Sequence, residues 1–212
     1  MWLLTLPGVY RPWHDTWLLA RALASERSLP GARVLDLCTG TGALAVLAAR
    51  RGAADVTAVD IRTNAVWNVR LNALLRRVSV QARRGDVDST NGSRFDVIVA
   101  NPPYVPTDVT PRGGQRHWAG GPDGRAVLDR LCAATGRMLA PGGVLLLVQS
   151  SLSNEERTLE RLRTSGLTAE VVDRRWLPFG PVLLQQRDWL LTGQRIAADQ
   201  YEEELVVIRA RR

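Results

Sequence analysis

Short apolar runs alternate along this chain with longer segments in which apolar residues recur every three to four positions. Strands are predicted at residues 33–37, 55–59, 78–82, 95–100, 144–149, 167–173 and 204–209. Helices are predicted at residues 43–51, 63–76, 124–139 and 154–165, the third ended by an Ala-Pro-Gly-Gly stop. Continuous apolar strand cores are typical of parallel strands that are covered on both faces. The pattern therefore predicts an α/β, Rossmann-like fold with a seven-stranded, mostly parallel sheet and helices on both faces.

No linker-like stretch divides the 212 residues, so we expect one domain, opening with an N-terminal segment and helix at residues 1–30. Residues 174–200 fit no element of the pattern and hold Trp176 and Trp189 among aliphatic residues. We interpret this stretch either as an insertion packed on the sheet edge or as a lid or partner surface that covers a site.

Composition excludes several classes of protein. The net charge is +7, yet the chain contains no lysine and its arginines are scattered, which indicates codon bias rather than a nucleic-acid surface. Cys38 and Cys132 have no metal-like spacing, so neither a metal site nor a disulfide framework is predicted. The longest apolar run is too short for a membrane span and no signal peptide opens the chain. We expect a cytoplasmic protein.

Acidic or glycine-rich turns follow the first three predicted strands, where ligands of such sheets bind. Gly40 and Gly42 allow a tight turn before a helix N-terminus that favours a negative group, and Asp36 can accept from an ammonium group. Asp60 can accept both hydroxyls of a ribose, although it can also cap the next helix. Asp86 can hold the exocyclic amine of an adenine or form a turn. The missing first glycine of G-x-G-x-x-G argues against a dinucleotide.

The fourth predicted strand runs into Asn101, Pro102, Pro103 and Tyr104. The two prolines hold the backbone extended and stiff. The Asn101 side-chain oxygen and the Pro102 carbonyl can then accept the two N–H groups of a planar –NH2, which lies against the flat face of Tyr104. Such a nitrogen is a poor nucleophile. Catalysis therefore requires a site that positions it and that aims hydrogen-bond acceptors at its N–H groups. A rigid turn without catalytic function is the alternative interpretation.

These features resemble the class I S-adenosylmethionine (SAM)-dependent methyltransferases, and residues 101–104 resemble the motif of the HemK-type glutamine-N5 methyltransferases. The wider class with this motif also methylates adenine, cytosine and guanine. Residues 9–19 and 117–125 are similar to two segments of the short branch that acts on class I release factors. For residues 10–16, a proline-ordered lead-in capped by Asp15 or Thr16 is an equal alternative.

The resemblance implies SAM as the cofactor and a role for each matching residue. It implies cofactor contacts for Thr16, Asp36, Cys38, Gly40, Gly42, Asp60, Ile61, Asp86, Val87 and Asn101. It implies catalytic roles for Asn101, Pro102 and Tyr104, substrate contacts for Tyr10, Pro103, Trp118 and Gly120, and no metal. Cys38 departs from the family, which usually has glycine there, so we expect a slightly different first turn.

The implied reaction is methylation of a glutamine side-chain amide in a protein, in a release-factor-like Gly-Gln context. The partners expected are that protein substrate and, because the eukaryotic branch works with one, a small activator protein; no membrane is expected. Three alternatives stay open: methylation of a small molecule or peptide in a biosynthetic pathway, methylation of an exocyclic base nitrogen, and a scaffold without activity. A base methyltransferase needs a nucleic-acid docking surface, and the intact motif argues against a scaffold.

Overall fold

A computed structural model of the protein describes residues 2–90, 92–108 and 117–212. The strands are β1 (Arg33–Leu37), β2 (Asp55–Asp60), β3 (Gln81–Arg84), β4 (Phe95–Ala100), β5 (Leu139–Ser150), β6 (Thr168–Pro178) and β7 (Glu202–Arg211). The helices are α1 (His14–Ser25), α2 (Ala43–Arg50), α3 (Thr63–Arg76), α4 (Leu128–Met138), α5 (Glu155–Thr164) and α6 (Pro181–Thr192). Short 3-10 turns, η1 (Val87–Thr90) and η3 (Ser151–Ser153), follow β3 and β5.

The strands form one seven-stranded sheet in the order β3-β2-β1-β4-β5-β7-β6. Strands β1 to β5 pair in parallel, and only β7 runs antiparallel to both of its neighbours. The predicted seven-stranded, mostly parallel sheet is confirmed. The order along the sheet reverses between β1 and β4, and ligands of such sheets bind in the crevice beyond the strands at that point.

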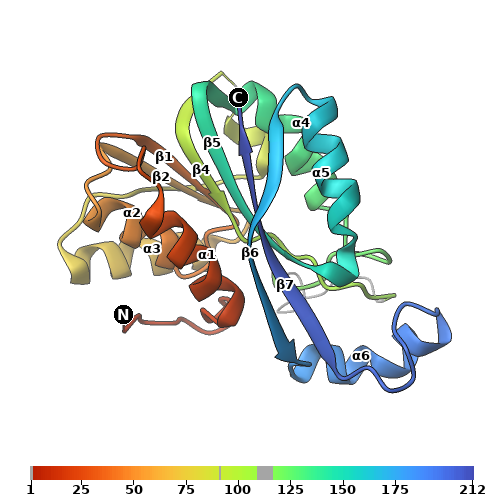
Figure 1. The fold of residues 1–212 in the computed structure, drawn as a ribbon. Coiled ribbons are helices and arrows are strands. Elements are labelled where there is room, and N and C mark those ends of the chain that lie inside the picture. Colours follow the sequence, from red (N-terminus) through yellow and green to blue (C-terminus); the bar gives the residue numbers. More distant parts are fainter. Residues whose placement is uncertain (1, 91, 109–116) are drawn as a thin grey trace.

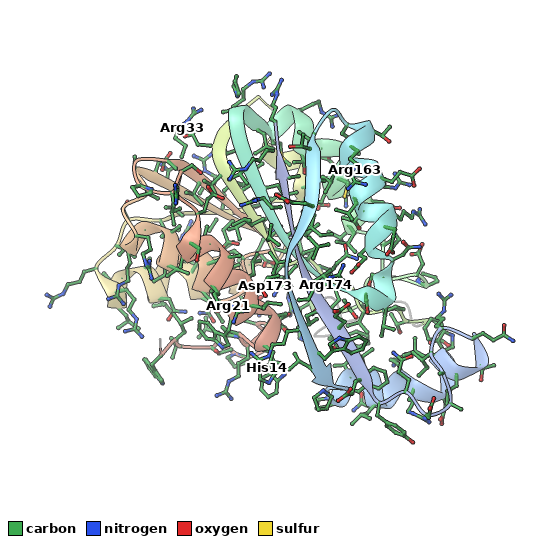
Figure 2. All side chains as sticks on the ribbon, in the orientation of Figure 1. His14, Arg21, Arg33, Arg163, Asp173 and Arg174 are labelled. Atoms are coloured by element: carbon green, nitrogen blue, oxygen red, sulfur yellow. The ribbon has the colours of Figure 1, made fainter. Side chains whose placement is uncertain are left out.

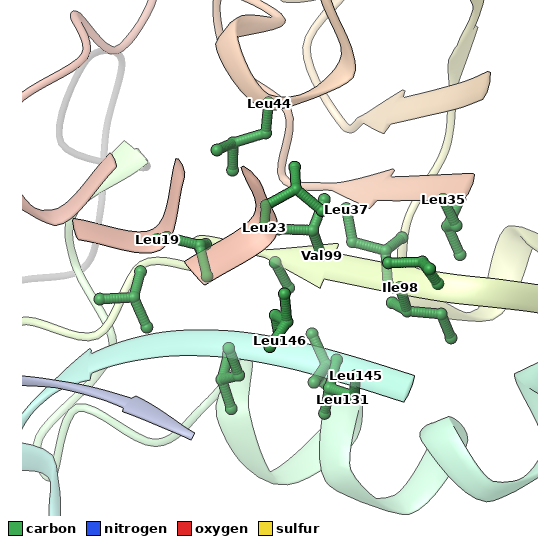
Figure 3. Packing of buried hydrophobic residues seen from close by; sticks show 14 of the residues in the cluster. Leu19, Leu23, Leu35, Leu37, Leu44, Ile98, Val99, Leu131, Leu145 and Leu146 are labelled. Atoms are coloured by element: carbon green, nitrogen blue, oxygen red, sulfur yellow. The ribbon is translucent and has the colours of Figure 1, made fainter. Parts of the chain in front are cut away.

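Helices cover both faces of the sheet, with α1, α2 and α3 on one side and α4 and α5 on the other (Figure 1). Figure 3 shows Leu19 and Leu23 of α1 with Leu44 of α2 above the central strands, and Leu131 of α4 below them. Because the central strands are buried on both faces, they read as continuous apolar runs in the sequence.

In the middle of the chain, three predicted features differ from those observed. The third strand was expected at residues 78–82 but lies at Gln81–Arg84, because Arg77 adopts a left-handed conformation (φ 55°) and the Val78 N–H caps α3 at Ala73. The third predicted helix begins only at Leu128 and ends at Met138, because Gly124 has φ 73°. The Ala-Pro-Gly-Gly segment is not a helix stop but a bulge in β5. The register between β4 and β5 shifts there, from Phe95 opposite Leu139 to Val97 opposite Val144.

The last part of the chain was the least predictable. Strands β6 and β7 extend well beyond the predicted residues 167–173 and 204–209, and their far ends carry α6 away from the body of the sheet (Figure 1). Helix α6 was not predicted; Gly180 is its N-cap and Pro181 opens its first turn, a position that suits proline. A small separate cluster of Phe179, Leu183, Leu190 and Ile196 holds this segment together.

Helix α1 is tied to the sheet by a salt bridge of 2.6 Å between Arg21 and Asp173 of β6, and the two residues lie side by side in Figure 2. His14 starts this helix on the side where β6 and β7 project toward α6 (Figure 2). The chain's N-terminal segment is thereby brought beside its C-terminal extension. Among the described residues, no helix is long and apolar enough to cross a membrane.

Candidate active site

The turn after β1 has three alternate positions with left-handed backbone geometry. Cys38, Gly40 and Gly42 have φ values of 58°, 54° and 81°. The left-handed region costs a residue with a Cβ roughly 1 kcal/mol or more, which explains why glycine is the ordinary choice at Cys38. Gly42 is the N-cap of α2, and a Cβ there would lie 3.1 Å from Val69. This conformation and this close contact suit glycine at the turn, and the expected cofactor contact of Gly42 stays a prediction.

Asp36 lies beneath this turn and is completely buried. Its Oδ2 accepts from the Thr39 hydroxyl at 2.6 Å and from the Ala45 N–H at 3.0 Å, while Oδ1 has no hydrogen-bond partner within the described chain. Burial raises the pKa of this carboxyl to about 7. A buried acceptor left without a donor fits a cationic ligand group such as the ammonium of an amino acid.

Asp60 connects the end of β2 to the same turn. Its Oδ2 accepts from the Gly40 N–H and its Oδ1 from the Arg62 N–H, both at 3.0 Å. The N-cap of α3 is Arg62, so the capping alternative for Asp60 does not hold. Burial raises the pKa of Asp60. Asp86, after β3, accepts from Arg130 at 2.9 Å, and Arg130 also binds Asp88.

A cavity of about 130 Å³ lies over these turns. Of the residues expected to bind the cofactor, it is lined by Cys38, Gly40, Asp60, Ile61, Asp86, Val87 and Asn101. Thr16, Asp36 and Gly42 lie behind that lining. Tyr10, Pro103 and His117 form its opposite side, so the expected cofactor and substrate residues meet in one place.

Asn101 is held in one orientation by the N-terminal helix. Its Nδ2 donates to Asp15 Oδ2 at 3.0 Å and to the Thr16 hydroxyl at 3.2 Å. A carboxylate can only accept, so the amide must present –NH2 to Asp15. The side-chain oxygen of Asn101 is thereby left to face the opposite way as an acceptor. Thr16 thus helps to orient Asn101, and its expected contact with the cofactor stays a prediction.

Asp15 was not predicted as a site residue, yet it binds four polar residues at this point: Tyr10, Thr16, Asn101 and Tyr104. Besides Asn101 it accepts from the hydroxyls of Tyr10 at 2.8 Å and Tyr104 at 3.2 Å. Burial and the neighbouring Asp15 raise the pKa of both tyrosines, so both hydroxyls stay protonated and donate. From the sequence, only a helix-cap role could be considered for Asp15, because its partners lie up to 89 residues away.

The backbone at Tyr104 and Val105 is held by Ser153 and by the segment at residues 117–125. The Ser153 hydroxyl donates to the Tyr104 carbonyl at 2.6 Å, and Val105 exchanges backbone hydrogen bonds with Trp118 and Gly120. A Cβ on Gly120 would lie 2.6 Å from the Gly124 carbonyl. Gly120 therefore shapes this segment and, unlike Trp118, lines none of the site's cavities.

Two further cavities adjoin the first. A small one of about 40 Å³ lies over the motif and is lined by Asn101, Pro102, Pro103, Tyr104, Tyr10, Asp15, Val105, His117 and Trp118. A groove of about 410 Å³ continues it between the N-terminal segment and α6. Tyr10 and His117, whose rings lie 5.5 Å apart, line all three spaces. Burial lowers the pKa of His117.

This arrangement suits transfer between two ligands. One ligand fits beyond β1, β2 and β3, and a small polar group fits at Asn101, where the two spaces meet. Among the described residues, no group of three His, Cys, Asp or Glu side chains is placed to hold a metal ion. The site contains hydrogen-bond acceptors, the stiff backbone of Pro102 and Pro103, and a partly enclosed space.

Comparison with known proteins agrees with this geometry. The family model for the methyltransferase small domain matches residues 1–172. A Methanocaldococcus jannaschii protein, named as a protein N5-glutamine methyltransferase, is 34% identical over 84% of this chain and 90% of its own length. The release factor glutamine methyltransferase of Deinococcus radiodurans is 39% identical over 77% of this chain, which spans only 61% of that protein.

Solved structures with the same fold include both a protein and an RNA methyltransferase. A chain of the E. cuniculi Mtq2–Trm112 complex, which methylates the termination factor eRF1, has a TM-score of 0.67 and 26% identity, covering 97% of this chain and 99% of that one. The T. thermophilus 16S rRNA N2 G1207 methyltransferase, solved with AdoMet and guanosine, has a TM-score of 0.64 and 25% identity, covering 98% of this chain and 46% of that one. Family model, curated relatives and motif agree: the chain belongs to the HemK-type family of SAM-dependent protein glutamine-N5 methyltransferases.

Proposed function

We propose that this protein methylates the side-chain amide nitrogen of a glutamine in a protein substrate, in a release-factor-like Gly-Gln context. The observation that carries the proposal is the orientation of Asn101. Its –NH2 is engaged by Asp15, so its oxygen is the acceptor offered where the cofactor cavity and the small cavity meet. A carboxamide supplies the matching donors.

The chain's own residues do the positioning. The Asn101 oxygen and the Pro102 carbonyl accept the two N–H groups of the target amide, and Tyr104 supports its plane. Holding those hydrogens draws electron density toward nitrogen and aligns its lone pair, and such positioning can supply several kcal/mol, on the order of 7 or more in the best cases. When bound, SAM supplies an electrophilic methyl group on its sulfonium. As the N–C bond forms, the methyl–sulfur bond would break, and the amide nitrogen would then lose one N–H proton to solvent.

The cofactor residues divide into those that touch the ligand and those that shape its site. Asp36 would pair its free Oδ1 with the ammonium of SAM, and Asp60 would accept from the ribose hydroxyls. Ile61, Asp86 and Val87 line the part of the cavity that would take the adenine. Cys38, Gly40 and Gly42 would let the backbone approach the methionine part.

A protein substrate is favoured over a nucleic-acid base by the outer groove. The groove is lined largely by apolar and aromatic residues of the N-terminal segment and α6, among them Trp13, Trp118, Leu177 and Leu183. Within the described part of the chain its lining contains one arginine, Arg11, where a nucleic-acid groove would have a basic stripe. A small molecule or peptide of a biosynthetic pathway remains the second candidate, since the same groove would admit it.

A small activator protein is the further partner that we propose. The outer side of α3 exposes Trp67, Leu74 and Leu75, which are 55%, 75% and 58% accessible, beside the edge strand β3. Exposed apolar faces of this kind mark protein interfaces. Leu74→Ser with Leu75→Ser should abolish co-purification of such a partner from the source organism, whereas Arg50→Ser on α2 should not. Unchanged recovery from the double variant would exclude this surface.

The proposed reaction is tested with tritiated SAM and a lysate of the source organism, comparing the wild type with Asn101→Ala. We expect label in one protein band, resistant to nuclease and lost after protease, and present only with the wild type. Label in nucleic acid or in a small-molecule fraction would overturn the substrate class. Label that persists with Asn101→Ala would overturn the role of Asn101.

A further inference from the structure

One carboxylate in the outer groove has an oxygen without a donor. Glu203 of β7 lines the groove together with Tyr10 and Asp15. Its Oε2 is buried and has no hydrogen-bond partner in the described chain, while the Ser150 hydroxyl supports the carboxyl group. Burying a charged acceptor unpaired is costly, so the position is one that a donor from outside the chain would stabilise.

The glutamate next in the chain shows what a structural role looks like on strand β7, because Glu204 forms a salt bridge. Glu204 binds Arg174 at 2.8 Å, and Arg174 also binds Glu155 at 2.6 Å. Glu202 is exposed to solvent. Glu203, between them, forms no salt bridge within residues 2–90, 92–108 and 117–212. Of these three glutamates, Glu203 is the one that lines the groove, and it has no cationic partner among the described residues.

The surroundings of Glu203 make this part of the groove electronegative. Asp15 lies close enough to raise the pKa of Glu203, and burial is the larger cause of that shift. The donors that engage Asp15 are the neutral groups of Tyr10, Tyr104, Asn101 and Thr16. Two carboxylates thus share one space in a chain whose net charge is +7.

Among the residues that the structure describes, the positive and titratable groups on the other walls do not neutralise this pair. Arg11 and His14 line the groove from its exposed rim and form no salt bridge in the described chain. His117 is held toward its neutral form, because burial and the charge of Arg62 lower its pKa. A ligand that brings its own cation would therefore be favoured, and a charge-assisted bond to a carboxylate is strong when water is partly excluded.

We propose that Glu203 is a specificity-determining residue that accepts from a basic side chain flanking the target glutamine. The proposal rests on the proposed function and names the sequence context of its substrate. The groove and the small cavity share Tyr10, Asp15 and Tyr104, so the side chain bound at Glu203 belongs to a residue near the glutamine. Arginine suits the role best, because its planar fork matches a carboxylate.

The test measures binding separately from methyl transfer. Two fluorescein-labelled peptides carry a Gly-Gly-Gln core flanked by arginine or by citrulline, its neutral analogue of the same shape. Their affinity is measured by anisotropy at pH 8 with S-adenosylhomocysteine present. The wild type should bind the arginine peptide at least about tenfold more tightly, as expected for a hydrogen bond to a charged group. Glu203→Gln should lose that preference and retain its affinity for the citrulline peptide.

Glu202→Gln is the matched control, because it removes the same charge from the exposed neighbour and should keep the preference. Equal binding of the two peptides by the wild type would overturn the proposal even if Glu203→Gln did not fold. The proposal would also be overturned if Glu203→Gln kept the preference for the arginine peptide and bound S-adenosylhomocysteine with unchanged affinity. A preference for arginine without any glutamine methylation would sustain the groove assignment while the proposed reaction fails.

Discussion

The two walls of the site are built in different ways. The cofactor wall consists of turns that directly follow β1, β2 and β3, so each contact depends on a few residues close in sequence. The substrate wall brings together the N-terminal segment, Tyr104, Trp118 and the far end of β7. The first wall uses local turn chemistry, and the second depends on packing between distant parts of the chain. Variants in each should therefore change different constants.

The largest effect is expected at Asp15, which joins the two walls. Asp15→Asn removes the acceptor that orients Asn101 and binds both tyrosine hydroxyls. Misplacement of this kind can cost about 100-fold, so kcat should fall by about that factor while the affinity for SAM stays nearly constant. Steady-state kinetics and calorimetry separate the two quantities.

Asp199→Asn, at an exposed position in the C-terminal extension, is the control for that substitution and should leave kcat unchanged. If Asp15→Asn weakened SAM binding and kept kcat, Asp15 would belong to the cofactor wall, and its proposed role in orienting Asn101 would be refuted.

Asp60→Ala should instead weaken the binding of SAM. It removes the acceptor proposed for the ribose and frees the Gly40 N–H, so the dissociation constant for SAM should rise about tenfold to 100-fold. The peptide affinity should not change. An unchanged SAM constant in calorimetry would refute the ribose assignment.

The affinity for SAM should also depend on pH. Burial raises the pKa of Asp36 to about 7, so its carboxyl loses its charge as the pH falls below that value. A neutral carboxyl no longer attracts the SAM ammonium, and binding should weaken about tenfold between pH 8 and pH 6. Asp36→Asn should be weak at both pH values. A wild-type affinity that is constant over this range would show that Asp36 does not pair with the ligand.

The smallest effect is expected at Cys38. Cys38→Gly relieves the left-handed conformation but gives the unfolded chain more freedom, so the free energy of unfolding should change by less than about 1 kcal/mol. Thermal denaturation measures this. A loss well above that value would mean that the cysteine side chain packs in a way essential to the turn.

The same contrast explains what could be predicted from the sequence. The central strands are apolar throughout and end in turn residues, so β1 and β4 were predicted within their observed bounds, and the turns that follow them were located with them. Helix α6 was missed, because prolines and glycines at residues 178–181 look like turn residues although Pro181 begins a helix. Asp15 and Glu203 were missed because their significance depends on neighbours distant in the chain.

The most direct measurement of the central claim is tandem mass spectrometry of a Gly-Gly-Gln peptide after incubation with SAM and either the wild type or Asn101→Ala. We expect the added methyl group on the glutamine side-chain nitrogen, only with the wild type, while both proteins bind SAM with similar affinity. A methyl group on any other atom, or its equal appearance with Asn101→Ala, would contradict the account.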